Sequence, residues 1–186
     1  MKYRVLKITA IIVALFLMLI FGQYAYLGGF SKIKFQTIEC GNEILVYEKM
    51  TGSYSETPRV MDSIYYRLLH EFGIETGKGF GIYYDNPQYV EAEKLRSEIG
   101  VILEPKDRNR ISEIDSTFCV KTLPVEMYLV AEFPFKSPLS IFIGMSKVYP
   151  AMTKYVAQHQ LNDGLVMEIY DVPNKKIIYR KLIQSE

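Results

Sequence analysis

A phrase that occurs twice is the strongest constraint on the fold of this chain. Residues 164–182 (GLVMEIYDVPNKKIIYRKL) are two apolar runs separated by a turn around Asp171 and Pro173, which is typical of a β-hairpin. Residues 81–87 (GIYYDNP) align with residues 167–173 (MEIYDVP), so that Tyr-Asp-x-Pro is repeated. This alignment predicts two modules of the same kind.

The order of the expected elements supports the duplication. The first half reads as a strand, a helix opened by Thr57-Pro58 and closed by Gly73, and two further strands, over residues 42–50, 57–72, 80–85 and 94–103. After a charged linker at 104–113, the second half has strands over 116–122 and 126–133, a helical segment and the hairpin. Pro150 either kinks that segment or starts a fresh helix.

We therefore predict an α+β fold of duplicated β-α-β-β modules. A pseudo-two-fold axis would relate the modules, and a central groove would form where they meet. Grooves at such junctions are favoured sites for small ligands.

The N-terminal segment predicts a membrane anchor. Residues 8–30 are almost entirely apolar, with Lys2, Arg4 and Lys7 before them, and about 20 such residues cross a bilayer. The basic flank predicts a single-pass protein with a cytoplasmic N-terminus and an extracytoplasmic domain. A cleaved signal peptide is the alternative, although residues 23–28 fit an A-x-A-like cleavage site poorly. We thus expect an anchor at 1–30, a linker at 31–38 and a ligand-binding domain at 39–186.

The composition excludes several other classes of protein. A net charge of +1 gives no electrostatic footprint for nucleic acid. Cys40 and Cys119 are too few for a disulfide scaffold, and we expect two free thiols, with one bridge as the alternative. His70 and His159 lie far apart without a cluster of ligand residues, so that we expect no metal and no cofactor.

Several segments resemble a known family of ligand-binding domains. They are FPFK at 133–136, MSKVYP at 145–150 and MEIYDVPNKKIIYR at 167–180, with GFGIYYDNP and EKLRSEIGVIL in the first half. This sequence resembles the GyrI-like small-molecule-binding domain, also called effector-binding or SOUL-related, over about residues 39–182. It is most similar to the branch that carries an N-terminal membrane anchor.

Glu168 is the principal candidate for a functional residue. The resemblance implies that a glutamate in this strand faces the groove and meets cationic, aromatic ligands. The resemblance also implies that, in some similar proteins, this glutamate is the general base, beside an aromatic hydroxyl, in the hydrolysis of strained cyclopropane compounds. A carboxylate in an apolar strand also has its pKa raised or requires a cation. The alternative is a solvent-facing residue that pairs with Lys176 or Arg180. Because the aligned residue Ile82 is apolar, we favour the groove.

Aromatic residues are the expected companions of Glu168. Tyrosine and phenylalanine rings would stack on a planar cation, although core packing is the ordinary role of any one of them. We expect Tyr128 as the partner of Glu168, in catalysis or in binding. The other candidate ligand-binding residues are Tyr170, Tyr83, Tyr84, Phe133 and Phe135.

These observations predict a membrane-anchored domain that binds a small amphipathic or cationic molecule between its halves. One alternative is a hydrolase of small reactive compounds that uses Glu168 and a tyrosine. Such an enzyme needs the carboxylate and a hydroxyl within hydrogen-bond reach. The other alternative is a membrane-proximal module that binds a protein partner through an exposed apolar patch.

Overall fold

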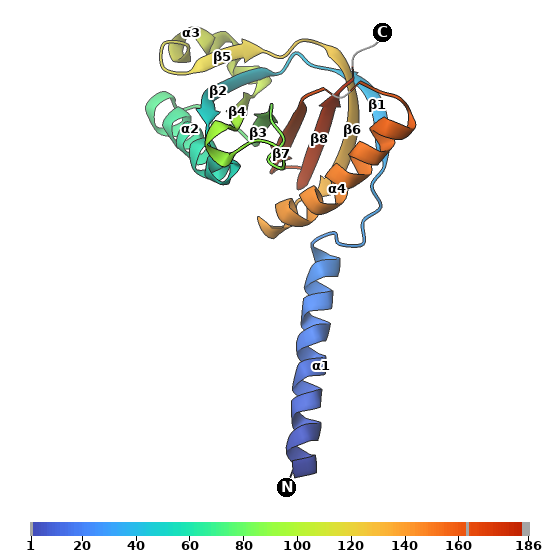
Figure 1. The fold of residues 1–186 in the computed structure, drawn as a ribbon. Coiled ribbons are helices and arrows are strands. Elements are labelled where there is room, and N and C mark those ends of the chain that lie inside the picture. The colour runs from blue at the N-terminus through green and yellow to red at the C-terminus, as the bar shows by residue number, and fades with distance from the viewer. Residues whose placement is uncertain (1, 163, 184–186) are drawn as a thin grey trace.

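One antiparallel sheet of eight strands organises the molecule, in the order β1-β6-β8-β7-β3-β4-β2-β5 (Figure 1). This computed structural model describes residues 2–162 and 164–183. The strands are β1 (Phe35–Cys40), β2 (Ile44–Thr51), β3 (Lys78–Tyr83), β4 (Arg96–Leu103), β5 (Cys119–Thr122), β6 (Glu126–Pro134), β7 (Val166–Asp171) and β8 (Lys176–Leu182). The α-helices are α1 (Lys2–Tyr26), α2 (Thr57–Phe72), α3 (Ile111–Ile114) and α4 (Leu139–Gln158).

The duplicated topology is confirmed. The modules are β2-α2-β3-β4 and β6-α4-β7-β8. Counted outward from the centre of the sheet, the second module has the order β7-β8-β6 and the first has β3-β4-β2. The third, fourth and first elements named in each module therefore occupy corresponding places. A pseudo-two-fold axis between the central strands β7 and β3 therefore exchanges the halves of this α+β fold.

The predicted alignment of the two modules is wrong by one residue. Strand β3 pairs with β7 so that Gly81 lies opposite Glu168 and Ile82 lies opposite Met167. Paired residues share a face of the sheet and neighbouring residues alternate, so Ile82 and Glu168 point to opposite faces. An axis perpendicular to the sheet keeps each residue on its face. The segment Gly81-Ile82-Tyr83 is thus the mate of Glu168-Ile169-Tyr170, and Tyr84 is not the mate of Tyr170.

Each half contributes an edge strand to the other half. Strand β1 pairs along its whole length with β6, and β5 pairs with β2. Residues 35–38, which the sequence assigned to a linker, therefore belong to the sheet. The charged segment 104–113 is also more ordered than expected, since it forms the 3-10 helix Pro105–Arg110 and the start of α3.

Two amphipathic helices cover one face of the sheet. Helix α2 has Pro58 in its first turn and ends at Gly73, whose φ of 64° suits a left-handed glycine cap. Helix α4 continues through Pro150, so no fresh helix begins at Ala151. Its inward residue Val148 packs against β6 and β8, whereas Ile64 of α2 packs against β2 and β4.

The two faces of the sheet differ in what covers them. Registers place the clusters beneath α2 and α4 on the same face, with strands β3 and β7 between them. The opposite face carries a third apolar cluster that includes Phe80 and Ile169. Helix α1 projects away from the sheet (Figure 1). Its side chains are exposed over its whole length.

Candidate functional site

Glu168 lies at the centre of the helix-covered face. Its strand β7 is one of the two central strands, and its neighbours in the register are Gly81 on β3 and Tyr179 on β8. Only 2% of the Glu168 surface is exposed. This placement agrees with the expectation that the carboxylate lies between the two halves, although the predicted repeat mate was incorrect.

Two tyrosine hydroxyls hold the Glu168 carboxylate. The Tyr149 hydroxyl on α4 donates to Oε1 at 2.6 Å, and the Tyr170 hydroxyl on β7 donates to Oε2 at 2.5 Å. Tyr170 lies two residues after Glu168, so strand alternation places both side chains on the same face. Each carboxylate oxygen therefore has one donor, from two different elements.

Burial dominates the electrostatics of this group. Desolvation raises the pKa of Glu168, and the hydrogen bonds from Tyr149 and Tyr170 lower it in part. Desolvation and the charge of Glu168 also raise the pKa of Tyr149 and of Tyr170 well above the usual value. Both phenols therefore remain protonated and act as donors.

Two other buried acids of the sheet, Glu98 and Asp171, have basic side chains beside them. Glu98, on the opposite face, forms an ion pair with Lys121, and Asp171 lies 4.0 Å from the Lys78 ammonium. Within the described ranges, Glu168 receives hydroxyl donors but forms no ion pair. It is a desolvated carboxylate without a positive partner.

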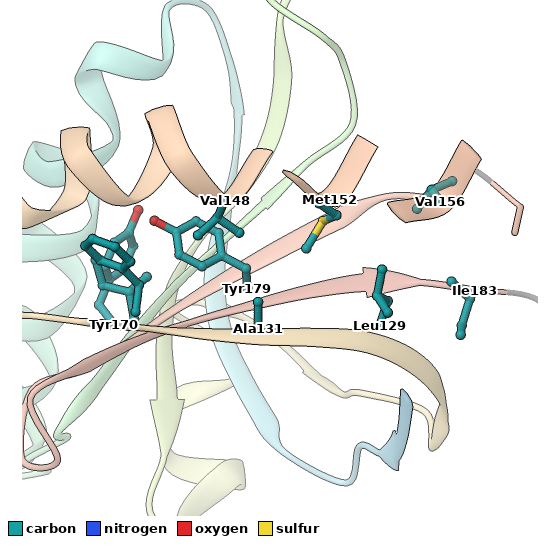
Figure 2. Close-up of a cluster of buried hydrophobic side chains, with 10 residues drawn as sticks. Leu129, Ala131, Val148, Met152, Val156, Tyr170, Tyr179 and Ile183 are labelled. Carbon is teal, nitrogen blue, oxygen red and sulfur yellow. The ribbon is translucent and has the colours of Figure 1, made fainter. Parts of the chain in front are cut away.

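Two further tyrosines complete the surroundings of the carboxylate. Gly81 has no side chain, and a Cβ there would lie 2.6 Å from the Tyr83 hydroxyl, so the Tyr83 side chain occupies the space beside Glu168. Tyr179 rises from the sheet toward α4 together with Tyr170 (Figure 2). The Tyr179 ring meets the Tyr149 ring edge to face, with centroids 5.9 Å apart.

Two of the predicted aromatic residues lie elsewhere. Tyr128 pairs with Leu182 and lies on the opposite face, where Glu126 and Cys40 influence its pKa, which burial raises to about 12. Tyr84 lies near Glu98, and burial also raises its pKa to about 12. Tyr128 is therefore not the partner of Glu168. Side chains alternate between the two faces along a strand, and both tyrosines occupy positions that point to the face opposite the carboxylate.

The remaining predicted residues lie on the same face as Glu168. Phe133 is buried beneath α4, and Phe135 packs near Tyr170 with ring centroids 6.4 Å apart. Tyr83 and Tyr170 contribute hydroxyls, as described above. Tyr149 and Tyr179 were not predicted from the sequence. The strand alternation of residues 176–182 could have indicated Tyr179, whereas Tyr149 required knowledge of how α4 docks.

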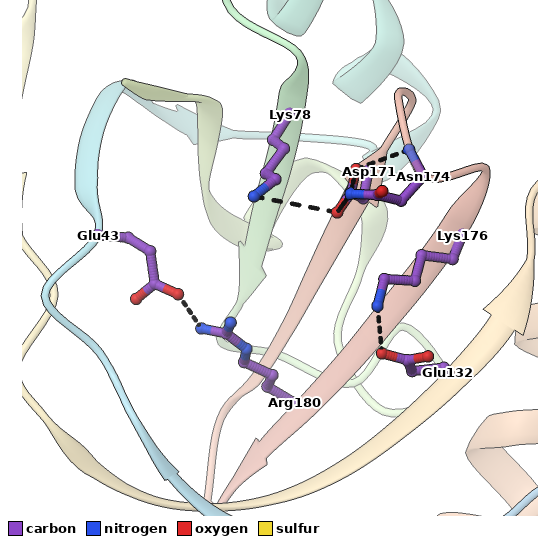
Figure 3. A network of polar contacts seen from close by, with 7 residues as sticks. All are labelled: Glu43, Lys78, Glu132, Asp171, Asn174, Lys176 and Arg180. Carbon is purple, nitrogen blue, oxygen red and sulfur yellow. Dashed lines mark hydrogen bonds and ion pairs between the residues drawn. The ribbon is translucent and has the colours of Figure 1, made fainter. Parts of the chain in front are cut away.

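The opposite face carries several ion pairs. Figure 3 shows Glu43 with Arg180 at 2.8 Å and Glu132 with Lys176 at 2.5 Å. Asp171 also accepts hydrogen bonds from Asn174 in the hairpin turn. The alternative in which Lys176 or Arg180 pairs with Glu168 is therefore wrong, because both pair with other acids on this face.

Comparison with known proteins identifies the domain. The family model of the GyrI-like small molecule binding domain matches residues 42–179. Testis-expressed protein 264 of Homo sapiens and its homolog of Mus musculus are 29% and 28% identical to this chain over 138 residues. These matches cover 69% of this chain but only 41% and 42% of those proteins. The matching region thus spans less than half the length of these relatives.

Solved structures share the fold at low sequence identity. The EcmrR–DNA complex covers all of this chain and 71% of that protein, with a TM-score of 0.60 and 11% identity. The C-terminal domain of EcmrR has a TM-score of 0.55 at 10% identity, over 83% and 98% of the two chains. SAV2435 bound to tetraphenylphosphonium has a TM-score of 0.50 at 13% identity, over 83% and 94%.

Proposed function

Because this chain belongs to the GyrI-like small-molecule-binding domain family, we propose that it binds a small amphipathic cation at Glu168. The observation that carries the proposal is the buried carboxylate that has hydroxyl donors but no positive partner within the described residues. A ligand cation would supply the missing charge, and the surrounding tyrosine rings would supply cation–π contacts.

Access to the carboxylate requires a local movement. Glu168 is almost fully buried, and Tyr149 covers it from α4. A rotation of the Tyr149 side chain, or a displacement of α4, would open one side of the carboxylate while Tyr170 remains in place on the same strand. The ligand would then exchange one hydroxyl hydrogen bond for an ion pair.

Tetraphenylphosphonium is a suitable first probe, since SAV2435 has been solved with it bound. We expect this cation to raise the thermal unfolding temperature of the full chain in detergent micelles, because a ligand that binds only the folded state stabilises it by mass action. Tetraphenylborate, an anion of the same shape, serves as the control and should give little stabilisation. Equal stabilisation by both ions would show that the site does not select a cation and that the charge of Glu168 does not contribute to binding.

Hydrolysis is a second candidate function, and the geometry of the hydroxyls favours it. The hydroxyls of Tyr149 and Tyr170 lie within hydrogen-bond reach of the carboxylate, as a general base with a neighbouring donor requires. Incubation of the full chain with strained cyclopropane compounds, followed by mass spectrometry, would test this function. Turnover that Glu168→Gln abolishes would support an enzyme, whereas unchanged compounds would favour binding alone.

We further propose that α1 anchors this domain in a membrane. Helix α1 is long and apolar enough to span a bilayer, and Lys2, Arg4 and Lys7 favour a cytoplasmic N-terminus. We assign residues 1–30 to the anchor. The ligand-binding domain then includes β1, because that strand is paired throughout with β6.

A further inference from the structure

The N-terminal half of α4 exposes an apolar surface that the Glu168 site does not use. Leu139, Phe142 and Met145 are 60%, 69% and 41% exposed, whereas Gly144 and Val148 on the inward side are buried. We call the three exposed side chains the α4 apolar surface. Large apolar side chains that gather on one exposed helix face mark a contact with a partner or a membrane.

The end of α1 is fixed beneath the same helix. Leu27 is buried in the turn that follows α1, and the Lys147 ammonium of α4 donates to the Gly29 carbonyl. A Cβ at Gly28 would lie 2.9 Å from the Phe133 ring, which shows how closely this turn approaches the domain. Figure 1 shows that the first turns of α4 are the part of the domain nearest to the level at which α1 ends.

The charge around this surface suits the boundary of a bilayer. The sequence contains no Asp or Glu between Glu132 and Asp163, but it contains Lys136, Lys147 and Lys154. Exposed Lys32 and Lys34 follow the end of α1. Lysines beside an apolar helix face are typical of helices that lie in a membrane interface, where anionic headgroups attract them.

We propose that the α4 apolar surface lies in the headgroup–acyl boundary of the bilayer that α1 spans. This inference rests on the proposed anchor. It goes beyond that anchor because it places part of the folded domain in contact with lipid. Helix α4 also carries Tyr149, so the lipid contact lies on the element that closes the site over Glu168. An amphipathic ligand dissolved in the membrane would therefore meet this helix first.

The absence of tryptophan from the sequence permits a direct test. Phe142→Trp places one reporter on the α4 apolar surface, and Tyr66→Trp places a matched reporter on the exposed side of α2, where Tyr66 is 55% exposed. Each full-length variant is incorporated into vesicles of phosphatidylcholine and phosphatidylserine. Flotation reports incorporation, and quenching by brominated lipids and by aqueous acrylamide reports the surroundings of the indole.

We expect the reporter at position 142 to emit at shorter wavelength than that at position 66. Brominated lipids should quench it at least twofold more strongly, and acrylamide less strongly. Equal quenching at both positions in floated protein would overturn the inference but leave the anchor intact. A blue-shifted reporter that neither reagent quenches would indicate a protein partner or a second copy, and would also overturn it. Protein that fails to float would overturn both the inference and the anchor.

Discussion

Glu168 is unusual because its surroundings stabilise a charge incompletely. Two hydroxyl donors satisfy its oxygens, yet burial dominates and its pKa is raised. The other buried glutamate, Glu98, has the Lys121 ammonium beside it. A buried acid that only neutral donors hold is destabilising when it is ionised, and such acids are typical of functional sites. This difference between two glutamates of one sheet is the physical basis of the proposed function.

Replacing Glu168 by glutamine should stabilise the protein at neutral pH. A raised folded-state pKa means that the native state holds its proton at pH values where the unfolded state has lost it. As far as this group is concerned, the free energy of unfolding is highest below the usual pKa of 4.5, and it decreases as the pH rises toward the folded-state pKa. Glu168→Gln removes this loss and keeps an acceptor for the tyrosines. We expect a gain of a few degrees at pH 7.5, about the shift that ~1 kcal/mol produces in a domain of this size.

Thermal unfolding of both proteins between pH 4 and 8 measures this effect. The difference between the variant and the wild type should disappear at the acidic end, where Glu168 is protonated in both states. A variant that is less stable than the wild type at every pH would show that the Glu168 carboxylate is a structural group.

Helix α4 is the element that connects the site to the rest of the fold. It supplies Tyr149 to the carboxylate, and its inward face packs on β6 and β8. Its close approach to the sheet depends on Gly144, since a Cβ there would lie 2.5 Å from the Tyr179 hydroxyl and 3.1 Å from the Phe133 ring. That Tyr179 hydroxyl is buried and has no hydrogen-bond partner among residues 2–162 and 164–183.

A double-mutant cycle tests this packing. Gly144→Ala should destabilise the protein by ~1–3 kcal/mol through overpacking. Tyr179→Phe removes the obstructing hydroxyl without breaking a hydrogen bond that the described residues form. The double variant should therefore recover much of the loss, and chemical denaturation gives the coupling between the two sites. Additive effects would mean that the hydroxyl does not limit the approach of α4.

The order of elements could be predicted from local chemistry, but the alignment of the modules could not. Gly73 and the pair Thr57-Pro58 mark the ends of α2 by backbone preferences that act within a few residues. The repeated Tyr-Asp-x-Pro phrase suggested the duplication but aligned it one residue off, because face and register depend on long-range pairing. For the same reason, Tyr128 was assigned to the wrong face. Tyr149 was missed because its contact with Glu168 depends on how α4 docks on the sheet.

The whole molecule combines a duplicated domain with an apolar helix at its N-terminus. The pairing of β3 with β7 joins the halves into one sheet, so the centre between α2 and α4 is shared by both modules. The turn after α1 is packed against the domain and not separated from it by a flexible tether. In the proposed anchoring by α1, the orientation of this helix would therefore determine on which side of the membrane the Glu168 site lies.

The membrane topology that we propose rests on the basic residues that precede the apolar span. We expect the domain to be extracytoplasmic and the anchor to be retained in the mature protein. Protease added to intact cells should degrade the domain, and N-terminal sequencing should recover the residues before the span. A domain that is degraded only after cell lysis, or a mature chain that begins near Tyr26, would contradict this assignment.

The affinity for tetraphenylphosphonium, measured by calorimetry on the full chain in detergent, tests the role of Glu168 most directly. Glu168→Gln preserves the shape of the side chain and removes its charge, so it should weaken binding by roughly tenfold or more, which corresponds to ~1.4 kcal/mol. Glu98→Gln is the matched control, because it removes a buried carboxylate from the opposite face, and it should bind as the wild type does. Equal affinity of the wild type and Glu168→Gln, or an equal loss in both variants, would contradict the assignment of Glu168 as the recognition residue.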